Sequence, residues 1–117
     1  MSKPLVLQVA ERARGLIVDP RSWTQFAIAR TGNNRHCEPT DAKAARFCAY
    51  GAILRAAHDV SGNDDQAQRL ADQTAMLIMG RDSPYSAFEE LIAINDGQRA
   101  TARKALLAVF DRALQDV

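Results

Sequence analysis

Apolar residues recur at spacings of three and four along most of this chain, which places them on one face of an α-helix. The first such run covers residues 4–18. Asp19-Pro20 ends it, because a residue before proline is disfavoured in the helical conformation. Similar runs after polar capping residues predict four more helices, at about 41–59 after Thr40, 64–79 after Asn63, 86–95 opening at Ser86, and from Thr101 onward.

The predicted helix at residues 41–59 contains an unusual stretch. Eight residues separate Arg46 from Arg55, and none of them is charged. A helix that carries charge on only a narrow strip is enclosed by other elements on most sides. We therefore expect this helix to be the buried centre of the fold.

Residues 23–30 interrupt the helical spacing. Phe26 and Ile28 alternate with small residues, a pattern typical of a short strand. The Thr-Gly-Asn-Asn sequence at 31–34 favours a turn, and residues 35–38 are predicted to form the return strand. The expected fold is mainly α: a compact single domain over residues 1–117, with five helices around the central one and one small β-hairpin that leans on them.

Composition adds limits on location and class. The chain has 117 residues, 47% hydrophobic and 25% charged, as in ordinary soluble domains. No segment approaches the roughly 20 apolar residues that span a membrane, and no signal peptide is expected before the first helix. Two cysteines are too few for a disulfide framework, so we expect a cytoplasmic protein with free thiols. Twelve arginines against three lysines, with abundant alanine, suggest a GC-rich bacterial genome.

Charge is unevenly distributed although the net charge is only +1. Residues 1–58 carry a balance of +5, residues 59–98 of −6, and residues 99–117 of +2. One interpretation is that both ends fold back on the middle, so that opposite charges meet at the surface. The other is a head-to-tail or self-complementary contact between subunits, because charge segregation bears on association.

Cys48 is the first candidate for chemistry. A nucleophilic thiol needs a nearby base and a partly exposed, electropositive site. His58 lies ten residues further along the same predicted helix, and His36 lies in the predicted hairpin. We therefore expect Cys48 to be a buried residue that acts as a small hydrophobe, and Cys48→Ser to cost roughly 1–3 kcal/mol of stability.

Metal ligands are also sparse. His36-Cys37 and His58-Asp59 provide too few ligands at no familiar spacing. Residues 59–64 resemble the start of a calcium-binding loop, but Leu70 occupies the position of the bidentate acid. We expect neither a metal ion nor a cofactor.

Nucleic-acid binding is considered because residues 21–46 contain five basic residues, with Trp23 and Phe26 among them. Stacking on aromatic rings next to arginines would suit a single strand. The same charges are equally typical of a solvated surface. A helix-turn-helix within residues 64–95 is disfavoured because its second helix carries Glu89 and Glu90 and no basic residue. We expect nucleic-acid binding to be unlikely.

Asn95-Asp96 directly follows an apolar helix face. Such a pair can close a pocket, or it can form a helix-ending turn whose side chains satisfy their own backbone. The sequence leaves both alternatives open.

Three segments occur in order: Trp23 at the start of the predicted hairpin, Arg-Phe-Cys-Ala-Tyr-Gly-Ala at 46–52, and Ile94-Asn95-Asp96 followed by Thr101. In this combination the chain resembles an uncharacterised bacterial and phage family, domain-of-unknown-function family 6197, over roughly residues 5–115. The positions that match the family's motif are Cys48, Gly51, Ala52, Asn95, Asp96 and Thr101.

The chain departs from the family at two places. Ile94 stands where an aromatic residue often precedes Asn-Asp, and Arg30-Thr31 stands where an acidic residue often precedes the hairpin turn. The resemblance implies a compact helical domain, and it brings no known activity.

The missing catalytic parts and the separated charge favour a non-enzymatic binding or assembly module that acts through protein–protein contacts or self-association. The alternative is a small-molecule binder or enzyme with a pocket between the hairpin, the central helix and the Asn95-Asp96 turn. In that pocket Trp23 would provide a stacking surface, Arg46 an anion contact, and Asp96 an acceptor or base. The candidate ligand-binding residues are Trp23, Arg46, Tyr50, Asn95 and Asp96, and a second alternative is single-stranded nucleic-acid binding by the basic hairpin region.

Overall fold

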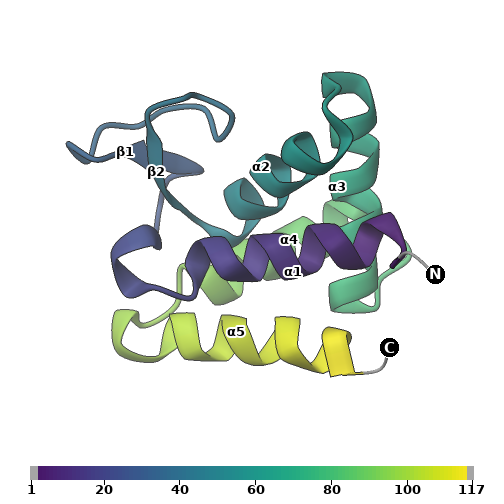
Figure 1. The fold of residues 1–117 in the computed structure, drawn as a ribbon. Helices are drawn as coiled ribbons and strands as arrows, with labels where there is room; N and C mark the ends of the chain where they lie inside the picture. Colours follow the sequence, from purple (N-terminus) through teal and green to yellow (C-terminus); the bar gives the residue numbers. More distant parts are fainter. Residues whose placement is uncertain (1–2, 116–117) are drawn as a thin grey trace.

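The computed structural model describes residues 3–115 and confirms a mainly α fold (Figure 1). Five α-helices and one two-stranded antiparallel hairpin occur in this range. The elements are α1 (Leu5–Ile17), the 3₁₀ turn η1 (Pro20–Ser22), β1 (Ala29–Thr31), β2 (Ala44–Phe47), α2 (Ala49–Ser61), α3 (Asp64–Met79), α4 (Pro84–Asn95) and α5 (Arg99–Gln115).

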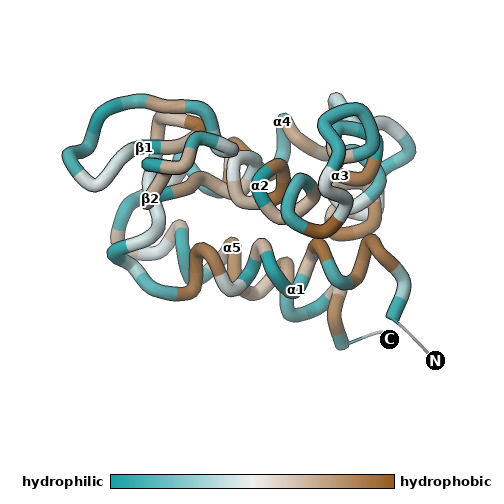
Figure 2. Tube along the Cα trace, turned by 45° about the horizontal axis from the view of Figure 1, so that its top comes forward, coloured by the Kyte–Doolittle hydropathy of each residue, from teal (hydrophilic) through white to brown (hydrophobic). Residues whose placement is uncertain are grey.

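The helices pack around α1 and α2. Helix α1 contacts α2 and α3 on one side and α5 on the other, and α4 packs against α2, α3 and α5 (Figure 1). Along α1 and α5, hydrophobic and hydrophilic residues alternate, as expected for helices with one buried face (Figure 2). The largest fully buried apolar side chains are Phe110, Ile17, Ile53, Leu91, Leu106 and Val9.

Several predicted helix ends are confirmed. Helix α3 covers 64–79 as predicted, because the Asn63 side chain accepts hydrogen bonds from the backbone amides of Asp65 and Gln66. Gly80 ends it in the left-handed conformation, with φ 62°. Helix α1 lies within the predicted range and ends just before Asp19-Pro20.

The predicted start of the central helix is wrong. Helix α2 begins at Ala49 rather than at residue 41, and Cys48 rather than Thr40 is its N-cap. Residues 44–47 instead form β2, where Arg46 lies opposite Arg30 and Phe47 opposite Ala29. Alanine-rich sequence here favours a helix locally, but pairing with β1 and burial of Phe47 override that preference.

The predicted return strand is also misplaced. Residues 35–38 do not form a strand. Their one β-bridge is an isolated antiparallel pair between His36 and Arg30. The main partner of β1 is β2, so residues 32–43 form a long connection between the two strands. Short strands are specified by what they pack against rather than by their own sequence, which is why the pattern alone did not identify the partner.

Two further helix starts differ from the prediction. Helix α4 begins at Pro84, where Ser83 rather than Ser86 is the N-cap and proline occupies the first turn. Helix α5 begins at Arg99, and Thr101 lies inside it instead of capping it. The backbone carbonyl of Gln98 already accepts hydrogen bonds from the amides of Thr101 and Ala102.

Candidate functional site

The Asn95 side chain joins three segments at the end of α4. It is fully buried. Its Oδ1 accepts hydrogen bonds from Trp23 Nε1 at 2.8 Å and from the Ala49 amide at 3.0 Å. Its Nδ2 donates to the Thr24 carbonyl at 3.1 Å and to Asp96 Oδ1 at 2.9 Å. Both polar atoms are thus satisfied within the protein, so Asn95 holds the site together rather than presenting a free amide.

Asp96 and Gln25 fasten the segment before β1 onto the same helix end. Asp96 Oδ1 accepts a hydrogen bond from the Phe26 amide at 3.0 Å. Gln25 Nε2 donates to the carbonyls of Asn95 and Gly97, at 3.0 and 2.8 Å. These bonds fix the backbone on both sides of the Phe26 side chain.

Phe26 has an uncommon conformation. Its φ is +61°, in the left-handed region that bulky residues rarely adopt. Its side chain is 70% exposed. Such strain persists where surrounding contacts determine the backbone, and it concentrates at functional positions. The strained backbone here directs an aromatic ring into solvent at the mouth of a cleft.

The cleft lies between the segment at 26–28, the start of α2 and the end of α4. Its volume is about 380 Å³, within the range of ligand pockets. The Tyr50 ring, which forms one wall, packs edge-on against Phe88 with the ring centroids 4.2 Å apart. The lining residues are Phe26, Ala27, Ile28, Cys48, Tyr50, Ile92, Asn95 and Asp96.

Gly51 allows the floor of the cleft to form. A Cβ at this position would lie 1.9 Å from the Ile28 carbonyl oxygen. That oxygen accepts a hydrogen bond from the Cys48 amide at 3.3 Å, which ties the strand segment to the start of α2. The close approach of the two backbones therefore requires glycine at residue 51.

Cys48 is buried, with 6% of its surface exposed, and its Sγ accepts a hydrogen bond from the Gly51 amide at 3.3 Å. Burial raises the pKa of the Cys48 thiol to about 11. The thiol is therefore protonated at neutral pH. Neither His36 nor His58 lines the cleft. The one carboxylate in the lining, Asp96, forms hydrogen bonds with the Phe26 amide and Asn95 rather than with Cys48.

The N-cap position of Cys48 changes the expected effect of replacing it. Serine is a preferred N-cap, and its hydroxyl is a better acceptor than a thiol. Cys48→Ser is now expected to change the free energy of unfolding by less than about 1 kcal/mol, whereas Cys48→Val, which has no acceptor, costs about 1–2 kcal/mol. Urea denaturation of both variants checks this, and a serine variant as unstable as the valine variant would contradict the capping role.

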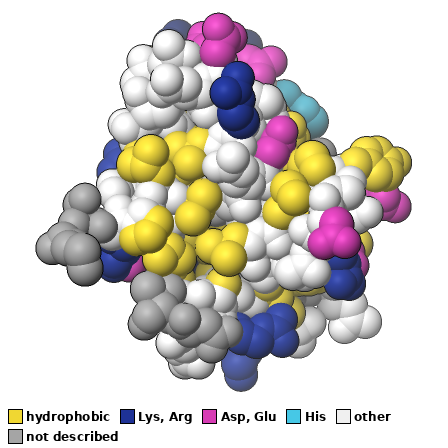
Figure 3. Space-filling model, turned by 90° about the vertical axis from the view of Figure 1, so that its right-hand side faces the viewer, with side chains coloured by type: hydrophobic (Ala, Val, Ile, Leu, Met, Phe, Trp, Pro, Cys, Tyr) yellow, Lys and Arg dark blue, Asp and Glu magenta, His cyan; other side chains and the backbone are white. Residues whose placement is uncertain are grey.

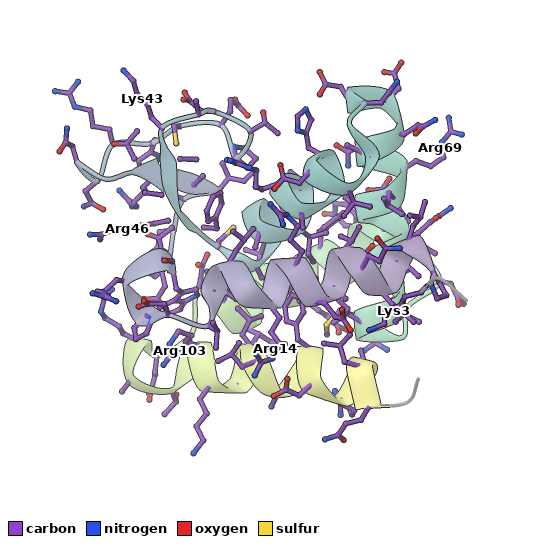
Figure 4. The ribbon with its side chains drawn as sticks, in the orientation of Figure 1. Lys3, Arg14, Lys43, Arg46, Arg69 and Arg103 are labelled. Atoms are coloured by element: carbon purple, nitrogen blue, oxygen red, sulfur yellow. The ribbon has the colours of Figure 1, made fainter. Side chains whose placement is uncertain are left out.

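The structure brings three of the five predicted ligand residues together: Tyr50, Asn95 and Asp96 line the cleft. Trp23 is 7% exposed and lies beneath it, with its indole hydrogen-bonded to Asn95. Arg46 lies on β2, on the side away from α2 (Figure 4). Trp23 and Arg46 therefore do not line this cleft.

The sequence interpretation missed Phe26, Ile28, Cys48 and Ile92 as lining residues. The positive φ of Phe26 has no signal in the sequence. Ile92, in the apolar spacing of the predicted helix at 86–95, is 39% exposed. A signal was present in α4, whose apolar residues occupy too wide an arc for one buried face: Tyr85, Phe88, Leu91, Ile92 and Ile94.

A second apolar hollow occurs at the other end of the molecule. Apolar side chains gather on the face formed by α3 and the beginning of α1 (Figure 3). The hollow there is lined by Leu5, Val60 and Leu70 together with polar residues, and its lining includes no carboxylate. The cleft beside α4 therefore differs from it in combining apolar walls with an acid.

Metal-binding clusters and membrane-spanning helices are both absent from residues 3–115. Among residues 3–115, no group of three or more His, Cys, Asp or Glu side chains is placed to hold a metal ion. No helix in this part of the chain is long and apolar enough to cross a membrane.

Comparison with known proteins gives one match. The model of a family described as "Family of unknown function (DUF6197)" matches residues 1–116. This match confirms the resemblance found in the sequence. No match was found among curated proteins or among solved structures.

Proposed function

Because the chain belongs to the DUF6197 family, whose function is unknown, we propose a function from the cleft itself: the protein is a non-enzymatic binding module. The cleft receives an apolar side chain of a protein partner, and Asp96 receives a basic group next to it. The observation that carries the proposal is a carboxylate in an apolar cleft that has no basic residue in its lining.

The charge of the acidic segment, residues 59–98, supports a basic partner. Within residues 3–115, five carboxylates of the acidic segment take part in no ion pair: Asp65, Asp72, Asp82, Glu89 and Asp96. Three side chains from residues 1–58 pair with carboxylates of residues 59–98: Arg12 and Arg55 with Asp59, and His58 with Asp64. All three pairs lie near the start of the acidic segment. Most of the negative balance therefore stays on the surface, where it favours a positively charged partner.

The extent of the exposed apolar surface supports a protein rather than a metabolite. Tyr85, Glu89 and Ile92 follow one another at helical spacing along one face of α4, and Asp96 is the C-cap four residues after Ile92. Tyr85 is 76% exposed and Ile92 39%. Together with Phe26 they extend the apolar surface beyond the cleft, and exposed aromatic residues are typical anchors of protein interfaces.

The chemistry available in the cleft favours binding over catalysis. Its lining provides one carboxylate and one protonated thiol, with no histidine, lysine or arginine. Nucleophilic and acid–base mechanisms need a base within hydrogen-bond reach of the group it activates. The side chains of this cleft do not form such a pair.

The expected setting is the bacterial cytoplasm. Two free cysteines, Cys37 and Cys48, support a reducing compartment, and the arginine- and alanine-rich composition supports a bacterial source.

Two probes of the same shape and opposite charge test the cleft. In ¹H–¹⁵N NMR titrations of the full chain, 2-phenylethylammonium is expected to shift the amides of Tyr50, Ile92 and Asp96, and 3-phenylpropionate is not. Asp96→Asn keeps an oxygen that accepts from the Phe26 amide but removes the charge, so it is expected to weaken binding of the ammonium probe about tenfold. Equal binding of both probes, or unchanged binding to Asp96→Asn, would contradict the proposal.

A photo-crosslinking residue at position 92 tests the protein partner. The crosslinked peptide, identified by mass spectrometry, is expected to contain an apolar residue beside Lys or Arg, and Asp96→Asn is expected to reduce the yield of the crosslink. A crosslinker in place of exposed Ala105, on α5, serves as the control. If the ammonium probe binds but no protein crosslinks, the small-molecule alternative replaces the protein partner.

Self-association is one form of this proposal, because the chain's own residues 21–46 carry five basic groups. Native mass spectrometry of the untagged protein is expected to show a multiple of 12.8 kDa if a second copy is the partner. The nucleic-acid alternative at the same basic region is weakened because Trp23 is buried and Arg30 is occupied by hydrogen bonds to Thr24, Gln25 and Asn34. Flow-through of the protein on a single-stranded DNA column at low salt would exclude that alternative.

A further inference from the structure

A third concave site, distinct from the cleft and from the apolar hollow, lies between the end of α1, η1 and residues 99–111 of α5. This groove has a volume of about 680 Å³. Four basic side chains line it: Arg14, Arg99, Arg103 and Lys104. Arg14 and Arg103 lie in the layer between α1 and α5 (Figure 4). Three of the four come from α5, within its first two turns.

The carboxylates near the groove are already paired. Asp111, the one acid in the lining, accepts a hydrogen bond from Arg14. Asp19, at the start of η1, accepts hydrogen bonds from the Arg21 guanidinium at 2.9 and 3.2 Å. These bonds lower the pKa of Asp19 to about 2, with a smaller contribution from the charge of Arg103. Asp111 and Asp19 are thus paired with Arg14 and Arg21, and neither carboxylate pairs with the basic residues in the first two turns of α5.

The remaining positive charge is not compensated. Arg99, Arg103 and Lys104 form no ion pair with any residue in the 3–115 range. Arg103 Nη1 donates to the Val18 carbonyl at 2.7 Å, which orients its guanidinium and leaves other N–H groups to bind a ligand. The net charge of the whole chain is +1, so a local excess of three positive charges marks the groove as a site for an anion.

The groove also has an apolar wall, formed by Pro20, Leu107 and the almost fully buried Trp23. A groove of this size exceeds what a lone phosphate ion fills and suits a ligand with a ring-sized apolar part. Guanidinium groups bind phosphate oxygens in a bidentate geometry. The ligand class that combines these properties is an aromatic base with an attached phosphate.

We propose that the groove between α1 and α5 binds a nucleoside phosphate through Arg99, Arg103 and Lys104. The ligand is either a free nucleotide or a unit of a single-stranded nucleic acid, which present the same chemistry. This inference is independent of the cleft beside α4: the two sites share no lining residue, and the charged side chain in the lining of the cleft is the carboxylate Asp96.

The test uses the ¹⁵N-labelled full chain and three probes: AMP, adenosine and an oligothymidylate. AMP or the oligonucleotide is expected to shift the amides of Ala100, Arg103 and Leu107, and adenosine, which lacks the phosphate, is not. Binding of AMP identifies a free nucleotide as sufficient, and binding of the oligonucleotide alone identifies a single strand. The absence of shifts with both phosphate-bearing probes, or equal shifts with adenosine, overturns the proposal.

A matched pair of double variants separates the groove from general charge. Arg99→Gln/Lys104→Gln removes two exposed cations whose side chains make no hydrogen bond within the described range, and it is expected to weaken binding at least about tenfold. Arg35→Gln/Lys43→Gln removes two exposed cations from the connection between β1 and β2 and is expected to leave binding unchanged. Equal weakening by both double variants overturns the assignment to this groove. Circular dichroism confirms that each variant is folded.

Discussion

Gly51→Ala is expected to destabilise the protein by about 3 kcal/mol or more. The added methyl group would lie 1.9 Å from the Ile28 carbonyl oxygen, and a backbone atom cannot rotate away as a side chain can. Relief requires α2 and the segment before β1 to separate, which breaks the hydrogen bond from the Cys48 amide to that oxygen. Overpacking of this kind typically costs 1–3 kcal/mol and sometimes more, and the lost hydrogen bond adds about 1 kcal/mol.

Gly15→Ala provides a matched control for this variant. Gly15 lies within α1, and a Cβ there would meet no atom within 4 Å. Alanine in a helix is favoured over glycine by up to about 1 kcal/mol, so this variant is expected to be slightly more stable than the wild type. Urea denaturation of both variants measures the difference. A Gly51→Ala protein as stable as the wild type would show that the two backbones do not approach as closely as described.

Asn95→Ala is expected to have a comparable effect, about 3–5 kcal/mol, for a different reason. The substitution leaves the Trp23 indole N–H, the Ala49 amide and the Thr24 carbonyl without their partner in the protein interior. Each buried polar group left unsatisfied costs about 1–3 kcal/mol. The loss also frees the start of α2 from the end of α4, so the cleft is expected to lose its shape together with stability.

A double-mutant cycle distinguishes this hydrogen-bond network from simple loss of volume. Trp23→Phe removes the indole donor and is expected to cost about 1–2 kcal/mol. In the Asn95→Ala/Trp23→Phe protein the indole N–H is no longer orphaned, so the combined loss is expected to be smaller than the sum of the single losses. Strict additivity would mean that the hydrogen bond from Trp23 to Asn95 contributes nothing. Asn33→Ala, at an exposed turn position, is the control and is expected to change stability by less than about 0.5 kcal/mol.

These two positions also explain part of the family motif in physical terms. Gly51 is required by a close backbone approach, and Asn95 by four hydrogen bonds in the interior. Cys48, a third motif position, is the N-cap of α2. These three motif positions therefore shape the cleft. Of the side chains proposed to contact a partner, Asp96 belongs to the motif, whereas Phe26 and Ile92 lie outside it.

Helices with strong local signals were predictable. The apolar spacing of α1 and the Asp19-Pro20 stop act within a few residues of the backbone they control, as do the Asn63 cap and Gly80 end of α3. The site was predictable in outline, because Asn95-Asp96 and the Arg46–Arg55 segment were singled out and a cleft lies where they meet. The mainly α class and the family followed from the same local features.

The sequence by itself determined the helical class and the extent of α1 and α3, because these depend on short-range periodicity, capping and turn chemistry. It singled out Asn95-Asp96, but the hydrogen bonds that Asn95 makes to Trp23, Thr24 and Ala49 come from distant parts of the chain. Only the tertiary structure decided that residues 44–47 form a strand, that Phe26 takes a left-handed backbone and faces solvent, and that the basic residues of α5 meet Arg14 across a groove. Each of these depends on contacts between residues far apart in the chain. Local preference at such positions is weak, and the free energy of long-range packing and hydrogen bonding outweighs it.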